Sequence, residues 1–118
     1  MHLYFAYGSN MNATQMGKRC PTARFITTAV LKDHRLTYPL RSQLWTGGVA
    51  GFESAPGCVL EGVVWELSDE ELAVMDEFED VGGGQYRRER IAVFTTSGEV
   101  LSPWTYIACP EDGGPFAP

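Results

Sequence analysis

A strand that leads directly into a capped helix is the feature of this sequence that most limits its fold. Residues 58–67, CVLEGVVWEL, form the strongest strand pattern in the chain, and Gly62 inside them indicates a bulge or a close backbone approach. Ser68 then stands three residues before Glu71, which is the spacing of a capping box. The sequence therefore predicts a strand over 58–67 and a helix that begins at Ser68.

The apolar positions of this helix define the face that it buries. Leu67 is placed to pack on Leu72 across the first turn, and Met75 and Phe78 follow Leu72 at spacings of three. Glu79 falls seven residues after Leu72 and four after Met75, so helix phase places it on the same stripe. The run of three glycines at 82–84 then breaks the helix.

The other elements follow from runs of apolar residues between turn residues. We predict a strand at 3–7, a helix at 12–18, strand at 25–38, a long loop at 41–57, and strands at 87–95 and 99–108 joined by a turn at Ser97 and Gly98. Five or six strands with two short helices indicate an α+β fold, a small mixed sheet curled into a β-barrel. We expect one domain over 1–109 and a flexible C-terminal tail over 110–118. In the long loop, Gly47, Gly48 and Gly51 are candidate hinges of a lid.

Composition excludes several classes of function. The 118 residues hold 9 Lys plus Arg against 15 Asp plus Glu, a net charge of −6, so nucleic acid is not an expected partner. No apolar run approaches the roughly 18 residues that a membrane span needs. Three dispersed cysteines and two histidines predict neither a metal site nor a disulfide framework. We expect a cytoplasmic protein, and the sequence leaves its oligomeric state open.

Glu79 is the first candidate for chemistry. Burial on the helix stripe, the nearby helix C-terminus and the like charge of Asp76 would each raise the pKa of its carboxyl group. A carboxyl group shifted in this way suits a general acid and base at neutral pH. The alternative is that Glu79 lies just past the last helical turn and points into solvent.

The turn Tyr7-Gly8-Ser9-Asn10 is the second candidate. Glycine allows close backbone approach to a ligand, and successive free N–H groups after a strand form a nest for a carboxylate or an oxyanion. The alternative is an ordinary connection from strand to helix in which Ser9 and Asn10 bond to their own backbone.

Aromatic and basic residues near the C-terminus have a structural and a functional interpretation. Tyr86 and Tyr106 are expected to pack in the core or at its rim. Arg88 and Arg90 share a strand face with Tyr86, whereas Arg87 points the other way. Pairing with neighbouring acids is one role for this cluster, and holding a substrate carboxylate is the other.

Taken together and in order, these motifs resemble the gamma-glutamylcyclotransferase family, which includes the AIG2-like proteins. The resemblance rests on four segments: FAYGSNM at 5–11, RCP at 19–21, EGVVWEL at 61–67, and MDEFE at 75–79 with YRR at 86–88 beyond. It implies a small barrel with a cavity, in which the amides of the Tyr7 to Asn10 turn bind the gamma-glutamyl group. It also implies that Glu79 is the catalytic acid and base and that Tyr106 is the family's late tyrosine in the substrate pocket.

The family's reaction needs no cofactor, neither metal nor nucleotide, and its partner is a small gamma-glutamyl compound. The substrate's α-amine attacks its own γ-carbonyl, which closes 5-oxoproline and releases an amine or amino acid. Asp80 departs from the family pattern, because many members have glycine there. Asn10 and Met11 resemble the branch that acts on gamma-glutamyl amino acids more than the branches for glutathione or gamma-glutamylamines.

Two other functions remain open at the level of sequence. Asp80 and the short chain fit a binding module on the same fold that takes a small molecule without turnover. The acidic composition and the tail rich in proline and glycine fit a protein-interaction domain.

Overall fold

The computed structural model describes residues 1–7, 13–37, 51–78, 81–82 and 86–108. Its elements, in chain order, are β1 (His2–Ala6), α1 (Ala13–Arg19), β2 (Arg24–Thr37), β3 (Gly51–Leu67), α2 (Asp69–Phe78), β4 (Tyr86–Arg90), β5 (Val93–Thr95), β6 (Val100–Leu101) and β7 (Trp104–Ala108). The strands form one seven-stranded sheet in the order β4-β7-β1-β3-β2-β5-β6. The turn at 8–10, the loop at 41–50 and the tail at 110–118 lie outside the described residues.

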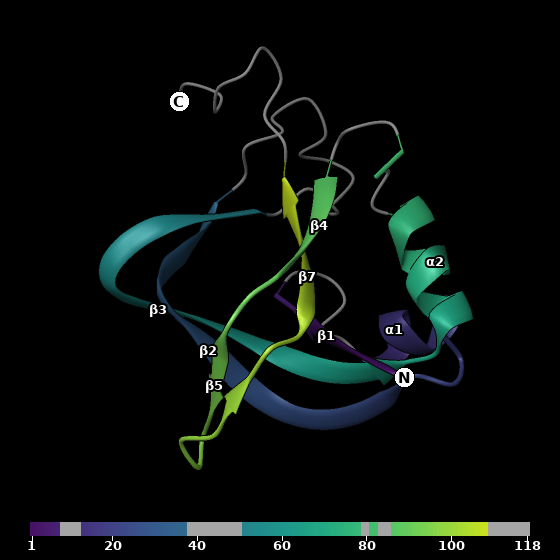
Figure 1. Ribbon diagram of the computed structural model, residues 1–118, viewed down its shortest axis with the longest axis horizontal. Coiled ribbons are helices and arrows are strands. Elements are labelled where there is room, and N and C mark those ends of the chain that lie inside the picture. Colours follow the sequence, from purple (N-terminus) through teal and green to yellow (C-terminus); the bar gives the residue numbers. More distant parts are fainter. Residues whose placement is uncertain (8–12, 38–50, 79–80, 83–85, 109–118) are drawn as a thin grey trace.

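The long hairpin of β2 and β3 gives the sheet its curvature (Figure 1). The strand predicted at 25–38 is confirmed. The loop predicted at 41–57 is wrong for 51–57, which belongs to β3 and pairs with 34–37 through residues 51–54. Pro56 and Gly57, which indicated a loop, lie instead at a bulge where the register of β2 and β3 shifts. Asp33, at a φ of 61°, accepts a hydrogen bond from the backbone N–H of Gly57 at 3.0 Å. Gly51 is thus a paired strand residue and not a lid hinge.

β1 is buried on both of its faces because the sheet separates two cores. The helix-side core holds side chains from the helices and one sheet face: Tyr4, Ala6, Met16, Cys20, Trp65, Leu67, Leu72, Met75, Tyr86 and Tyr106. The barrel-side core fills the concave face: Phe5, Tyr7, Ala29, Leu31, Leu60, Val64 and Val93. Alternate residues of β1 enter alternate cores, which is why its sequence is apolar without a polar face.

One hairpin connects the two edges of the sheet. The turn predicted at Ser97 and Gly98 is confirmed, with Gly98 at a φ of 88° and its N–H bonded to the Thr95 carbonyl at 3.0 Å. The strand predicted at 87–95 is divided into β4 and β5, and the strand predicted at 99–108 is divided into β6 and β7. β4 and β7 pair at one edge of the sheet, while β5 and β6 pair at the other. This division gives seven strands where five or six were expected. The sheet curls into a half-barrel with both helices on one side (Figure 1), which confirms the predicted fold class.

The predicted capping box begins α2. The backbone N–H of Glu71 donates to Ser68 Oγ at 3.1 Å, and the Ser68 N–H donates to Glu71 Oε1 at 3.4 Å. Burial alone would raise the pKa of Glu71, but these bonds and one from the Thr22 N–H at 2.8 Å outweigh it and lower that pKa. The predicted apolar stripe is confirmed for Leu72 and Met75. The helix that the sequence placed at 12–18 is likewise present as α1.

Phe78 does not belong to the buried stripe. Its side chain is 54% exposed, and the Arg19 guanidinium lies 4.6 Å from the ring centroid. α2 ends at Phe78, before the glycine run that was expected to break it. The last turn of α2 therefore buries less of the apolar stripe than ideal helical periodicity predicts.

Gly62 is a point of close backbone approach, as predicted. A Cβ atom at this position would lie 2.5 Å from the Ala6 carbonyl oxygen and 2.5 Å from the Phe5 ring. Only glycine lets β3 pass β1 at this separation, since neither the backbone oxygen nor the enclosed ring has room to move.

We predict that Gly62→Ala lowers the free energy of unfolding by about 2 kcal/mol or more, because the added methyl overpacks the joint between β1 and β3. Urea titration checks this value. Gly17→Ala is the matched control: its Cβ meets nothing within 4 Å, and alanine in helix α1 stabilises by up to about 1 kcal/mol. Equal stability of wild type and Gly62→Ala would contradict the prediction.

Candidate active site

Two of the predicted site residues, Tyr7 and Tyr106, are described. Gly8, Ser9, Asn10 and Glu79 lie outside the described residues, but the elements that lead to them are defined. β1 carries the chain to Tyr7 and pairs in parallel with β7, with Tyr4 opposite Trp104. The end of β1 and the Tyr106 backbone consequently meet at the same level of the sheet.

Tyr7 joins the end of β1 to β7 and to the long hairpin. Its side chain is buried, and its hydroxyl donates a hydrogen bond to the backbone carbonyl of Tyr106. Its ring meets the Phe52 ring edge to face, at 5.1 Å between centroids. Phe52 in turn meets the His34 ring at 5.3 Å. Phe52 was not identified from sequence, because it falls in the segment expected to be a loop.

The Tyr106 side chain lies on the other face of the sheet, toward the helices. Its hydroxyl donates to Asp76 Oδ1 at 2.7 Å and lies 3.5 Å from the Leu72 carbonyl oxygen. Burial raises the pKa of the phenol well above its usual range, and the Asp76 carboxylate raises it further. Tyr106 therefore remains neutral and acts as a hydrogen-bond donor to the helix.

Asp76 connects this tyrosine to an arginine. Arg88 Nη1 lies 2.9 Å from Asp76 Oδ2, so each carboxylate oxygen has a partner on a different strand. Pairing with acids, one of the roles expected for the arginine cluster, is confirmed for Arg88 and for Arg87, which pairs with Glu89. Arg90 instead donates to the Ser102 carbonyl. The sequence identified Asp76 only as a charge near Glu79, since nothing in its spacing indicates contacts with residues 12 and 30 positions away.

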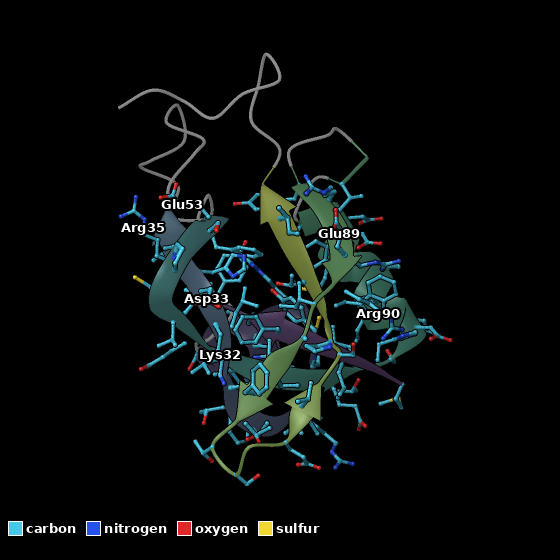
Figure 2. All side chains as sticks on the ribbon, turned by 60° about the vertical axis from the view of Figure 1, so that its left-hand side comes forward. Lys32, Asp33, Arg35, Glu53, Glu89 and Arg90 are labelled. Carbon is cyan, nitrogen blue, oxygen red and sulfur yellow. The ribbon has the colours of Figure 1, made fainter. Side chains whose placement is uncertain are left out.

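The arginines of β4 also cover an aromatic ring. The guanidinium carbons of Arg88 and Arg90 lie 4.7 and 4.4 Å from the centroid of Trp104. In Figure 2, Arg90 lies on β4, whereas Arg35 and Glu53 form an ion pair at one end of the β2–β3 hairpin. The cationic groups near Tyr106 are thus held by Asp76 and Trp104.

A separate hollow of about 320 Å³ lies between β2, β3 and β5. It is lined by Thr28, Ala29, Val30, Glu61, Gly62, Phe94, Thr95 and Thr96. This lining contains neither Tyr7 nor Tyr106, and Glu61 is its sole carboxylate. Among the described residues, the hollow and the candidate site therefore share none.

The described part of the chain contains neither a metal-binding cluster nor a membrane-spanning helix. No group of three or more His, Cys, Asp or Glu side chains there is arranged to hold a metal ion. None of the helices in those same residues has the length and apolar character needed to cross a membrane.

Comparison with known proteins agrees with this architecture. The family model described as gamma-glutamyl cyclotransferase, AIG2-like, matches residues 4–117. The chain belongs to this family, as its ordered motifs indicated. A solved structure of a gamma-glutamyl cyclotransferase superimposes with a TM-score of 0.84 at 34% identity, covering 92% of this chain and 67% of that one.

Curated relatives are similar over nearly the whole chain. Human gamma-glutamylcyclotransferase is 34% identical over 120 residues, which span 98% of this chain and 64% of the human protein. AIG2-like protein D of Arabidopsis thaliana is 33% identical over 116 residues, 95% of this chain and 70% of that protein. This chain thus spans less than two thirds of the length of the human relative.

We predict that Tyr106→Phe lowers the free energy of unfolding by about 1.5 kcal/mol at pH 7, because the hydroxyl donates to a charged acceptor. The raised pKa means that Tyr106 stays protonated in the folded state while it ionises in the unfolded state above about pH 10. The advantage of wild type over Tyr106→Phe should therefore be constant below pH 9 and shrink above pH 10. Urea titrations across this range measure it, and a difference that grows with pH would contradict the assignment.

Proposed function

We propose that this protein is a gamma-glutamylcyclotransferase that converts a small gamma-glutamyl amino acid or amine to 5-oxoproline. The observation that carries the proposal is the family match over residues 4–117, which includes every motif of the candidate site. Sequence identity of 34% to the human protein of that name supports it.

In this mechanism Glu79 moves one proton. Its carboxylate takes a proton from the substrate's α-ammonium group, and the free amine then attacks the γ-carbonyl carbon of the same molecule. The tetrahedral intermediate collapses as the protonated Glu79 returns the proton to the departing nitrogen, and the bond from the γ-carbon to that nitrogen breaks. The ring nitrogen, which holds two hydrogens after the attack, loses its extra proton to the released amine, which leaves as an ammonium ion. The products are 5-oxoproline and the free amine or amino acid.

The turn at Gly8, Ser9 and Asn10 is proposed to bind the substrate through backbone N–H groups. These donors would hold either the α-carboxylate or the oxyanion of the intermediate. Because nucleophile and electrophile belong to one molecule, catalysis depends chiefly on folding the glutamyl chain into a reactive shape. Tyr7 directly precedes this turn in the sequence, and its ring and hydroxyl are held by Phe52 and by the Tyr106 carbonyl. We propose that Tyr7 and Tyr106 border the gamma-glutamyl pocket.

Asn10 and Met11 favour gamma-glutamyl amino acids as the substrate class. We also propose a cytoplasmic location and a role in glutathione metabolism. Cys20 and Cys58 are free thiols, and Cys58 is exposed, which suits a reducing compartment.

We predict that the wild-type protein releases 5-oxoproline from at least one of gamma-glutamyl amino acids, gamma-glutamylamines and glutathione. Glu79→Gln keeps the shape but removes the acid and base, so kcat should fall by about 100-fold or more. Glu77→Gln is the matched control, because it removes the same charge from an exposed residue of α2 and should leave kcat unchanged.

Two outcomes would contradict the proposal. A wild-type protein that is silent on the whole panel, yet binds 5-oxoproline saturably, would support the binding module on the same fold. Activity that survives in Glu79→Gln would show that another group transfers the proton.

A further inference from the structure

The carboxylate of Asp76, three residues before the proposed acid in the sequence, lies at the centre of a contact among three elements. Asp76 stands in the last turn of α2, and its two oxygens meet Tyr106 of β7 and Arg88 of β4. Arg88 and Tyr106 are direct partners in the antiparallel register of β4 and β7. One carboxylate thus ties the end of the helix to a single cross-strand pair.

The backbone of Asp76 adds a second constraint. Its carbonyl oxygen accepts a hydrogen bond from the Val81 N–H at 3.0 Å. This bond joins the two residues that bracket segment 77–80, and Glu79 belongs to that segment in the sequence. The side chain and the backbone of Asp76 therefore fix the point from which the chain proceeds to Glu79.

The negative charge of Asp76 is balanced by the positive charge of Arg88. The side chains of Asp76 and Arg88 are 30% and 28% exposed, so solvent screens their interaction only in part. Asp76 contacts Arg88 of β4 and Tyr106 of β7, and the Tyr106 ring packs on Tyr4 of β1. Arg19 of α1 lies over the Phe78 ring, and the exposed Glu77 follows Asp76 in the sequence. The nearest full charge opposite Asp76 is that of Arg88.

We propose that Asp76, held by Arg88 and Tyr106, is a positioning residue for the cyclotransferase reaction: it anchors the end of α2 and sets the charge beside Glu79. The inference rests on the proposed function, in which Glu79 is the acid and base. Asp76 does not touch the substrate in this scheme. Asp76 instead affects the position of Glu79 and the pH range over which Glu79 transfers a proton.

The test compares three variants that change the cluster differently. Asp76→Asn removes the negative charge and leaves Arg88 without its partner. The remaining positive charge favours the ionised form of Glu79, so the ascending limb of the pH–rate profile should move to lower pH by about half a pH unit or more. Arg88→Gln leaves Asp76 uncompensated and should move the same limb up. Tyr106→Phe changes no charge, so its limb should stay in place.

All three variants should lower kcat, Asp76→Asn by about 10- to 100-fold, with KM changed by less than about threefold. Glu77→Gln is again the control, because it removes an equal charge next to Asp76 without touching the cluster. Thermal unfolding of each variant shows that it is folded at the assay temperature. Should Asp76→Asn fail to fold, the upward limb shift expected of Arg88→Gln, compared with the unmoved limb expected of Tyr106→Phe, still decides.

The outcomes separate this inference from the proposed function. Opposite limb shifts in Asp76→Asn and Arg88→Gln, with reduced kcat, support it. Wild-type kcat in these variants, or limbs that move in the same direction, overturn it while the proposed function stands. A wild-type protein silent on every gamma-glutamyl substrate overturns both.

Discussion

Burial of the first strand on both faces is the constraint on which the rest of this structure depends. Phe5 and Tyr7 fill the concave side of the sheet, while Tyr4 and Ala6 pack beneath the helices. Because β1 lies between β7 and β3, it joins the C-terminal hairpin to the long curved one. Gly62 determines how closely β3 approaches β1, since a larger residue would not fit at this separation. The proposed substrate turn follows β1 directly in the sequence, so the chain enters it from a strand whose last three residues are buried.

Local chemistry explains which parts of the fold could be predicted from the sequence. The capping box at Ser68 and Glu71 and the turn at Gly98 depend on neighbours within four residues, and both were predicted correctly. The bulge at Asp33 and Gly57 depends on pairing between residues 24 positions apart. Glycine and proline in one strand look like a loop until the partner strand supplies an acceptor for the freed N–H. Tertiary pairing here overrode the local preference.

Phe78 and Asp76 show the same limit at the candidate site. Helix phase placed Phe78 in the core, but the end of α2 leaves it exposed beneath Arg19. Helix phase gave no role to Asp76 beyond repulsion, whereas the fold brings Arg88 and Tyr106 to its two oxygens. The motifs name only candidate residues for the site. The partners that orient them come from β4 and β7, which are distant in sequence, and only the fold brings them together.

The contact between Asp76 and Arg88 also alters the electrostatic argument for Glu79. From sequence, Asp76 was one of three influences that raise the pKa of Glu79. A carboxylate paired with a guanidinium at 2.9 Å presents much less net field to its surroundings than an isolated one. The like-charge contribution is therefore reduced, and Asp76 matters more for holding the helix end than for repelling a proton donor. This division of labour suits the proposed intramolecular cyclisation, in which the substrate brings its own nucleophile and the protein would contribute mainly geometry and one transferable proton.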